Sequence, residues 1–71
     1  MELSAVLTPA REGGYVAFNP ETGTATQGET VEEALANLAE ATRLYLEEFP
    51  MNITFRVLLA TFQIPEYLNY P

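Results

Sequence analysis

Apolar and polar side chains alternate along the first eight residues of the chain. Leu3, Ala5 and Leu7 fall on one side of an extended backbone and the residues between them on the other. This spacing is typical of a strand, which Pro9 would end. The run of aromatic and β-branched residues over 15–18 predicts a second strand.

Turn-forming residues separate these runs. Gly13 and Gly14 can take positive φ angles, and residues 19–23, Asn-Pro-Glu-Thr-Gly, combine proline and glycine as a hairpin requires. A short third strand is predicted over 24–27 and ended by Gly28. The three strands should form an antiparallel meander.

A capping box opens the next element. The Thr30 hydroxyl is placed to accept the Glu33 amide, and the Glu33 side chain to reach back to the Thr30 amide. Apolar residues then recur with a helical period up to Pro50, which disfavours helical geometry at the residue before it. The predicted apolar stripe consists of Val31, Leu35, Leu38, Thr42, Tyr45, Leu46 and Phe49, with Ala34 and Ala41 beside it.

Alternation returns after the helix and predicts a fourth strand over 53–60, in which Ile53, Phe55, Val57 and Leu59 share one side. This strand runs parallel to the first, and a right-handed crossover places it beside the first strand. The expected fold class is therefore α+β. Its elements follow the order β-β-β-α-β, with a small mixed sheet of order 3-2-1-4 packed on one helix.

The last ten residues, 62–71, are unusually apolar. An exposed segment of this kind usually marks an interface, and the alternative is that it folds back over the open sheet face. We predict an oligomer interface, and its apolar residues are Phe62, Ile64, Tyr67, Leu68 and Tyr70.

Size and charge narrow the function. A 71-residue chain is one domain with a small core, and at 48% hydrophobic residues it is expected to complete that core with a second copy, as a dimer or tetramer. The formal net charge of −7 disfavours direct binding to nucleic acid or to an anionic membrane. It favours a basic partner, although acidity can also serve only solubility.

The chain contains no Cys and no His, which removes disulfides, thiolate catalysis, zinc sites and imidazole acid–base chemistry. No cofactor or metal site is expected. The first residues do not resemble a signal peptide, and no apolar run approaches the roughly 18 residues of a membrane span. We expect a cytoplasmic protein.

The order of motifs over residues 13–48 closely resembles the N-terminal domain of HicB-like antitoxins. The family pattern runs as a GGY strand, a P-E-x-x-G turn, T-Q-G-x-T, E-E-A-L and L-Y-L-E. The positions that match it are Gly13, Gly14, Tyr15, Pro20, Gly23, Thr26, Gln27, Gly28, Thr30, Glu33, Ala34, Leu46 and Glu47. The resemblance implies a HicB-like domain over 1–61, with a partial ribonuclease H-like fold, followed by the tail 62–71.

Members of that family neutralise a small basic toxin that cleaves messenger RNA, by covering its RNA-binding surface. The resemblance thus implies an antitoxin-type protein-binding module whose carboxylates replace RNA phosphates. Many members carry an additional DNA-binding unit. This chain alone is not expected to bind DNA directly. The expected contacts are exposed acids near the hairpin and the helix start, namely Glu12, Glu21, Glu29 and Glu32.

Two other classes remain open. One is a solitary self-assembling scaffold domain without a toxin partner, held together by the fourth strand and the tail. The other is an acid-dependent hydrolase, which needs several carboxylates converging on two metal ions. The first strand offers only Glu2 and the fourth offers no acid, so no enzyme activity is expected.

Overall fold

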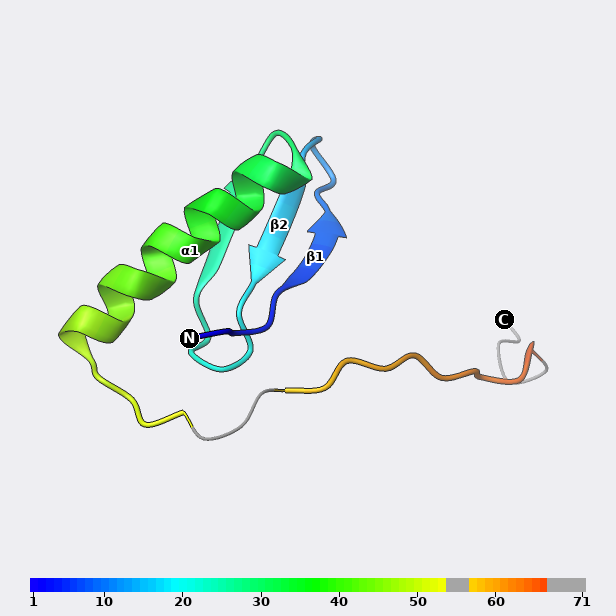
Figure 1. The fold of residues 1–71 in the computed structure, drawn as a ribbon. Helices are drawn as coiled ribbons and strands as arrows, with labels where there is room; N and C mark the ends of the chain where they lie inside the picture. Colours follow the sequence, from blue (N-terminus) through cyan, green and yellow to red (C-terminus); the bar gives the residue numbers. More distant parts are fainter. Residues whose placement is uncertain (54–56, 67–71) are drawn as a thin grey trace.

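The computed structural model describes residues 1–53 and 57–66. Within them the chain forms β1 (Val6–Pro9), β2 (Tyr15–Phe18), β3 (Ala25–Gly28) and α1 (Val31–Glu48). The strands pair antiparallel in the order β1-β2-β3, and α1 lies across one face of the sheet (Figure 1). The α+β class and the predicted meander are confirmed.

The strand register assigns side chains to two faces of the sheet. Leu7 pairs with Ala17 and Ala17 with Thr26, whose hydroxyl donates to the Ala34 carbonyl of α1 at 3.0 Å. These residues therefore face the helix. Phe18, one residue further along β2, is exposed on the opposite face.

The turn between β2 and β3 is organised by a buried side chain. Asn19 is 1% exposed, and its Oδ1 accepts the Thr22 backbone N–H at 2.9 Å while its carbonyl accepts the Gly23 N–H at 2.8 Å. Gly23 has a φ of 83°, and Gly13 and Gly14 in the first turn have φ values of 110° and 76°. The predicted use of glycine at positive φ is confirmed.

Helix α1 begins and ends where the sequence predicts. The Thr30 hydroxyl accepts the Glu33 N–H at 3.1 Å, and the helix ends at Glu48, two residues before Pro50. The predicted second hydrogen bond of the capping box is wrong, because the Glu33 carboxylate accepts the backbone N–H of Glu29 and not that of Thr30. It thereby ties the connection between β3 and α1 to the first helical turn.

The core lies between α1 and strands β2 and β3. Its buried apolar residues are Ala17, Ala34 and Leu38. Gly28 sets how α1 sits on the sheet, because a Cβ at this position would lie 2.4 Å from the Ala34 nitrogen. Only a glycine allows so close an approach of helix to strand.

The buried line of α1 is rotated from the centre of the predicted stripe. It runs through Ala34, Leu38 and Thr42, whereas Leu35 is 38% exposed. The reason is that α1 packs mainly on β3 and β2, while β1 meets the core only through the partly buried Leu7 (Figure 1). One apolar side of the helix consequently faces open space above β1.

The predicted fourth strand is not observed at the described residues of its segment. Residues 54–56 lie outside the described part of the chain, and Ile53 and residues 57–60 have no regular secondary structure. The predicted order 3-2-1-4 is thus confirmed only for its first three members. Val57 nevertheless lies beside the residues that lead into β1, where its N–H donates to Glu21 at 3.0 Å and its carbonyl accepts the Ser4 hydroxyl at 3.1 Å.

Beyond Val57 an apolar arm, defined here as residues 58–66, leaves the body on the side of β1 away from α1 (Figure 1). Leu58 is 94% exposed and Phe62 is 83% exposed. The radius of gyration, 15.1 Å, exceeds the roughly 11 Å of a compact chain of this length. Of the residues predicted for the oligomer interface, Phe62 and Ile64 belong to this arm, and Tyr67, Leu68 and Tyr70 lie outside the described residues.

Candidate protein-binding surface

A polar hollow of about 500 Å³ lies where the β1–β2 turn meets the end of β3 and the start of α1. We call it the acidic hollow. Its lining residues are Ala10, Glu12, Gly13, Tyr15, Gln27, Gly28, Glu29 and Glu33.

Local backbone chemistry positions the acids of the hollow. The Gly13 N–H donates to the Ala10 carbonyl at 3.1 Å, and the Ala10 N–H donates to the Gly14 carbonyl at 2.9 Å. This tight turn places Glu12 at its tip. On the other side, the hydrogen bond from the Glu29 N–H to the Glu33 carboxylate fixes the spacing of two further acids.

Two of the four predicted contact residues, Glu12 and Glu29, come together in the acidic hollow. Glu33 is a third lining acid that the sequence prediction missed, because it was assigned only to the helix cap. Its position four residues after Glu29 was the available signal. Glu32 is exposed on the first turn of α1 and does not line the hollow.

Glu21, the fourth predicted contact residue, does not line the acidic hollow. It lies in the β2–β3 turn, at the other end of the meander from Glu12. Its carboxylate accepts the Ser4 N–H at 2.9 Å, the Ser4 hydroxyl at 2.8 Å, the Asn19 amide at 2.7 Å and the Val57 N–H at 3.0 Å. The Val57 and Ser4 backbone hydrogen bonds, in that order, are the main causes that lower the pKa of Glu21 to about 2. Glu21 is therefore a structural anchor.

The chemistry of the acidic hollow suits a cation borne by a protein. Among the described residues, its lining includes three carboxylates and no Lys or Arg. Carboxylates accept charge-assisted hydrogen bonds from guanidinium and ammonium groups, and Arg can bind them in bidentate fashion. Within the described residues, no group of three or more His, Cys, Asp or Glu side chains could hold a metal ion.

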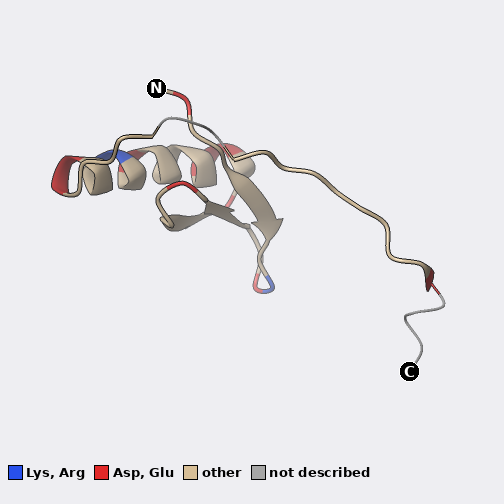
Figure 2. Cartoon of the chain, turned by 90° about the horizontal axis from the view of Figure 1, so that it is seen from below, with Lys and Arg blue, Asp and Glu red and all other residues tan. Residues whose placement is uncertain are grey.

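Four of the six remaining acids, Glu32, Glu40, Glu47 and Glu48, lie along α1. Acidic residues occupy both ends of the helix, and the arm carries no charged residue before Glu66 (Figure 2). Arg43 is paired with Glu47 at 2.7 Å. In the described part of the chain, no helix combines the length and the apolar character needed to cross a membrane.

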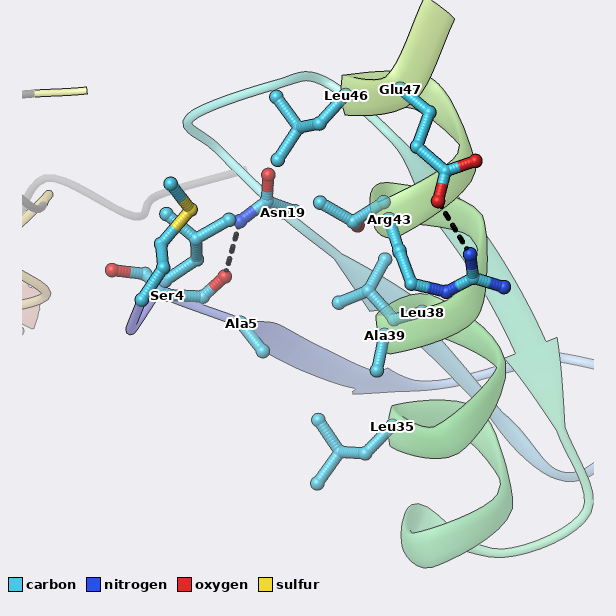
Figure 3. Close-up of a pocket in the computed structure, with 12 residues that line it drawn as sticks. Ser4, Ala5, Asn19, Leu35, Leu38, Ala39, Arg43, Leu46 and Glu47 are labelled. Carbon is cyan, nitrogen blue, oxygen red and sulfur yellow. Dashed lines mark hydrogen bonds and ion pairs between the residues drawn. The ribbon is translucent and has the colours of Figure 1, made fainter. Parts of the chain in front are cut away.

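A second, apolar hollow of about 570 Å³ lies between α1 and the segment that leads into β1. We call it the apolar groove. From the helix, Leu35, Leu38, Ala39 and Leu46 point toward Ser4 and Ala5 on its other wall (Figure 3). None of the four predicted contact acids lines it.

Comparison with known proteins gives a family without an assigned function. The model of DUF7387, a family of unknown function, matches residues 4–56. The UPF0150 protein ssl0738 of Synechocystis sp. (strain ATCC 27184 / PCC 6803 / Kazusa) is 44% identical over 48 residues, which cover 66% of this chain and 67% of that protein. No solved structure matches the chain.

Proposed function

Since the chain belongs to the DUF7387 family, whose model covers its whole folded body, we propose a function from its geometry and from its resemblance to HicB-like antitoxins. In this proposal the chain is an antitoxin-type protein-binding module that neutralises a small basic mRNA-cleaving toxin in the cytoplasm. The observation that carries this proposal is the acidic hollow, in which Glu12, Glu29 and Glu33 surround one concave surface.

The module acts by binding, without catalysis or a cofactor. A toxin that binds RNA needs Lys or Arg side chains where phosphates dock. The carboxylates of the acidic hollow bind these Lys and Arg side chains in place of the phosphates. The electric field of a chain with a net charge of −7 accelerates its association with the toxin. The toxin surface is then closed to RNA.

The proposal includes the finer part of the fold. Residues 53–60 form the fourth strand, beside β1, when the chain is assembled, which gives the order 3-2-1-4 of a partial ribonuclease H-like sheet. Val57 supports this arrangement, because its backbone already binds Ser4 and Glu21 next to the β1 edge. Within the described residues the outer edge of β1 has no neighbouring strand, and pairing with the fourth strand supplies one.

The test begins with the tagged chain as bait in a lysate of its native host, with elution by a salt gradient. A small basic ribonuclease released as salt rises is the expected product. Its association rate is then measured against the Glu12→Gln/Glu29→Gln variant. The control, Glu40→Gln/Glu48→Gln, removes the same two charges from exposed positions of α1 outside the hollow.

We expect the hollow variant to slow association by about tenfold at low salt, and the control variant to slow it much less. Equal slowing by both variants would mean that net charge acts without a defined site. If the toxin candidate is detectable in the lysate and only the chain itself is recovered, the antitoxin function is wrong.

The alternative function is a self-assembling scaffold domain without a toxin partner. The exposed apolar arm favours it, because an acidic binding module does not by itself need such a segment. Recovery of the chain alone in the same experiment is the result that this alternative expects.

A further inference from the structure

We propose that the apolar groove of one copy binds the apolar arm of a second copy, so that two chains exchange arms in a symmetric dimer. This proposal does not depend on the existence of a toxin, and it excludes a fourth strand over residues 58–60, because exchange places those residues in the groove of the second copy. It starts from two unfilled surfaces on the same chain, one concave and one extended.

The groove is unfilled because of how α1 sits. The helix packs mainly on β3 and β2, so the side of α1 that bears Leu35, Ala39 and Leu46 has no covering element among the described residues (Figure 3). The charged side chains at its rim, Arg43 and Glu47, neutralise each other in a salt bridge. The groove thus offers apolar surface with little net charge to a second acidic chain.

The arm has the matching chemistry. Residues 57–65 contain no charged side chain. In an extended segment alternate residues share one side, which places Leu58, Phe62 and Ile64 together and leaves Leu59, Thr61 and Gln63 on the other side. One edge of the arm is therefore apolar over its length, as a segment that inserts into a groove requires.

The lengths also agree. Residues 57 to 64 span about 23 Å when extended, at about 3.3 Å per residue. The groove wall from Leu35 to Leu46 spans about 16 Å, at about 1.5 Å per helical residue. One arm is long enough to cover one groove.

The occupant is a second copy because the chain's own arm begins at the rim and leaves in another direction. Val57 is held by Ser4, which lines the groove, and by Glu21, and beyond it the arm passes β1 on the side away from α1 (Figure 1). The buried apolar residues of the described chain are only Ala17, Ala34 and Leu38, a small core for 71 residues. Exchange enlarges that core in both copies, and a self-complementary contact closes as a two-fold dimer.

The first test is the mass in solution by light scattering. We expect the native chain at about twice the monomer mass of 7.9 kDa. Phe62→Glu on the arm and Leu35→Glu in the groove should each reduce the mass to that of one chain. The matched controls add the same charge one residue away, as Gln63→Glu and Ala36→Glu, and should leave the dimer intact. Far-ultraviolet circular dichroism establishes that each variant keeps α1.

A native mass of one chain would overturn the proposal. So would a dimer that resists both Phe62→Glu and Leu35→Glu, because its interface must then lie elsewhere, such as the sheet face that bears Phe18.

The second test identifies the donor of the arm. The native chain has no Cys, so single cysteines report without background. Phe62→Cys chains are mixed with differently tagged Leu35→Cys or Leu46→Cys chains, which mark the two ends of the groove, and are then oxidised. A disulfide between the two tags is expected for at least one pair. A chain that carries both Phe62→Cys and Leu35→Cys is oxidised in the same way. If its disulfide forms within one chain and no disulfide links the two tags, each arm fills its own groove and exchange is overturned.

Discussion

Glu21 joins three parts of the chain that are distant in sequence. Its carboxylate receives hydrogen bonds from Ser4 before β1, from Asn19 in the turn, and from Val57 after α1. A single carboxylate thus holds the N-terminal segment and the returning chain against the same turn. Glu21 therefore stabilises the fold by joining these segments, although its charge and its position in a turn suggested a contact with a partner.

The low pKa of Glu21 gives a prediction for the pH dependence of stability. The pKa is about 2 in the fold and has an ordinary value of 4.5, so the ionised group stabilises the fold fully above about pH 4.5. That contribution is lost as the pH falls from 4.5 toward 2. The difference in unfolding free energy between the native chain and Glu21→Gln should therefore shrink over this range, as measured by urea denaturation at a series of pH values.

A graded variant tests the cause. Ser4→Ala removes the hydroxyl donor but keeps the Ser4 backbone N–H, which is the stronger of the two contributions. The difference between the native chain and Ser4→Ala should therefore change less with pH than the difference for Glu21→Gln. A Glu21→Gln difference that stays constant from pH 6 to pH 2 would contradict the assigned role.

Gly28 gives a second prediction at the residue scale. The Cβ of Gly28→Ala would lie 2.4 Å from the Ala34 nitrogen and 2.8 Å from its Cα, both of which are backbone atoms that cannot rotate away. Displacing α1 from β3 should cost about 1–3 kcal/mol of unfolding free energy, the usual penalty of overpacking. Gln27→Ala is the control, because the Gln27 side chain is exposed and its backbone carbonyl still accepts the hydrogen bond from the Asn37 side-chain amide. Equal stability of the two variants in chemical denaturation would contradict the close approach.

At the scale of elements, the N-cap of α1 provides the sharpest test. Thr30→Ala removes the oxygen that accepts the Glu33 N–H and should lower the unfolding free energy by about 1 kcal/mol. Thr30→Ser retains the hydroxyl and should remain within a few tenths of a kcal/mol of the native chain. If thermal unfolding of the serine variant matches that of the alanine variant, the methyl group and not the cap is what stabilises this site.

Elements with local signals were predictable from the sequence. Proline and glycine positions placed both turns, and the Thr30 cap with Pro50 bounded α1 to within one or two residues. The rotation of α1 was not predictable, because it depends on the close approach of Gly28, a contact between elements. The fourth strand rested on alternation alone, and a strand also needs an edge to pair with, which no local pattern can specify.

At the scale of the whole molecule, the same limit explains the site. Glu12 and Glu29 were predicted as exposed acids, and the meander then brings their turns together. Glu33 was missed because it was assigned only to the helix cap, and Glu21 was included because composition and spacing do not reveal that its carboxylate already has several donors. The apolar groove was equally hidden, since the helix stripe was read as buried along its whole width.

The arm gives the last prediction, for the concentration dependence of thermal stability. If two chains share a core through their arms, folding is coupled to association, and a hundredfold rise in chain concentration should stabilise the dimer by about 2.7 kcal/mol. The melting temperature of the native chain should rise accordingly, as followed by circular dichroism at the signal of α1. Deleting residues 62–71 removes Phe62 and Ile64 from the arm, so the truncated chain should melt lower and at a temperature independent of concentration. A native chain whose melting temperature does not change with concentration would mean that one copy folds alone, with Ala17, Ala34 and Leu38 as the buried apolar side chains of its described part and with the Glu21 and Asn19 hydrogen bonds.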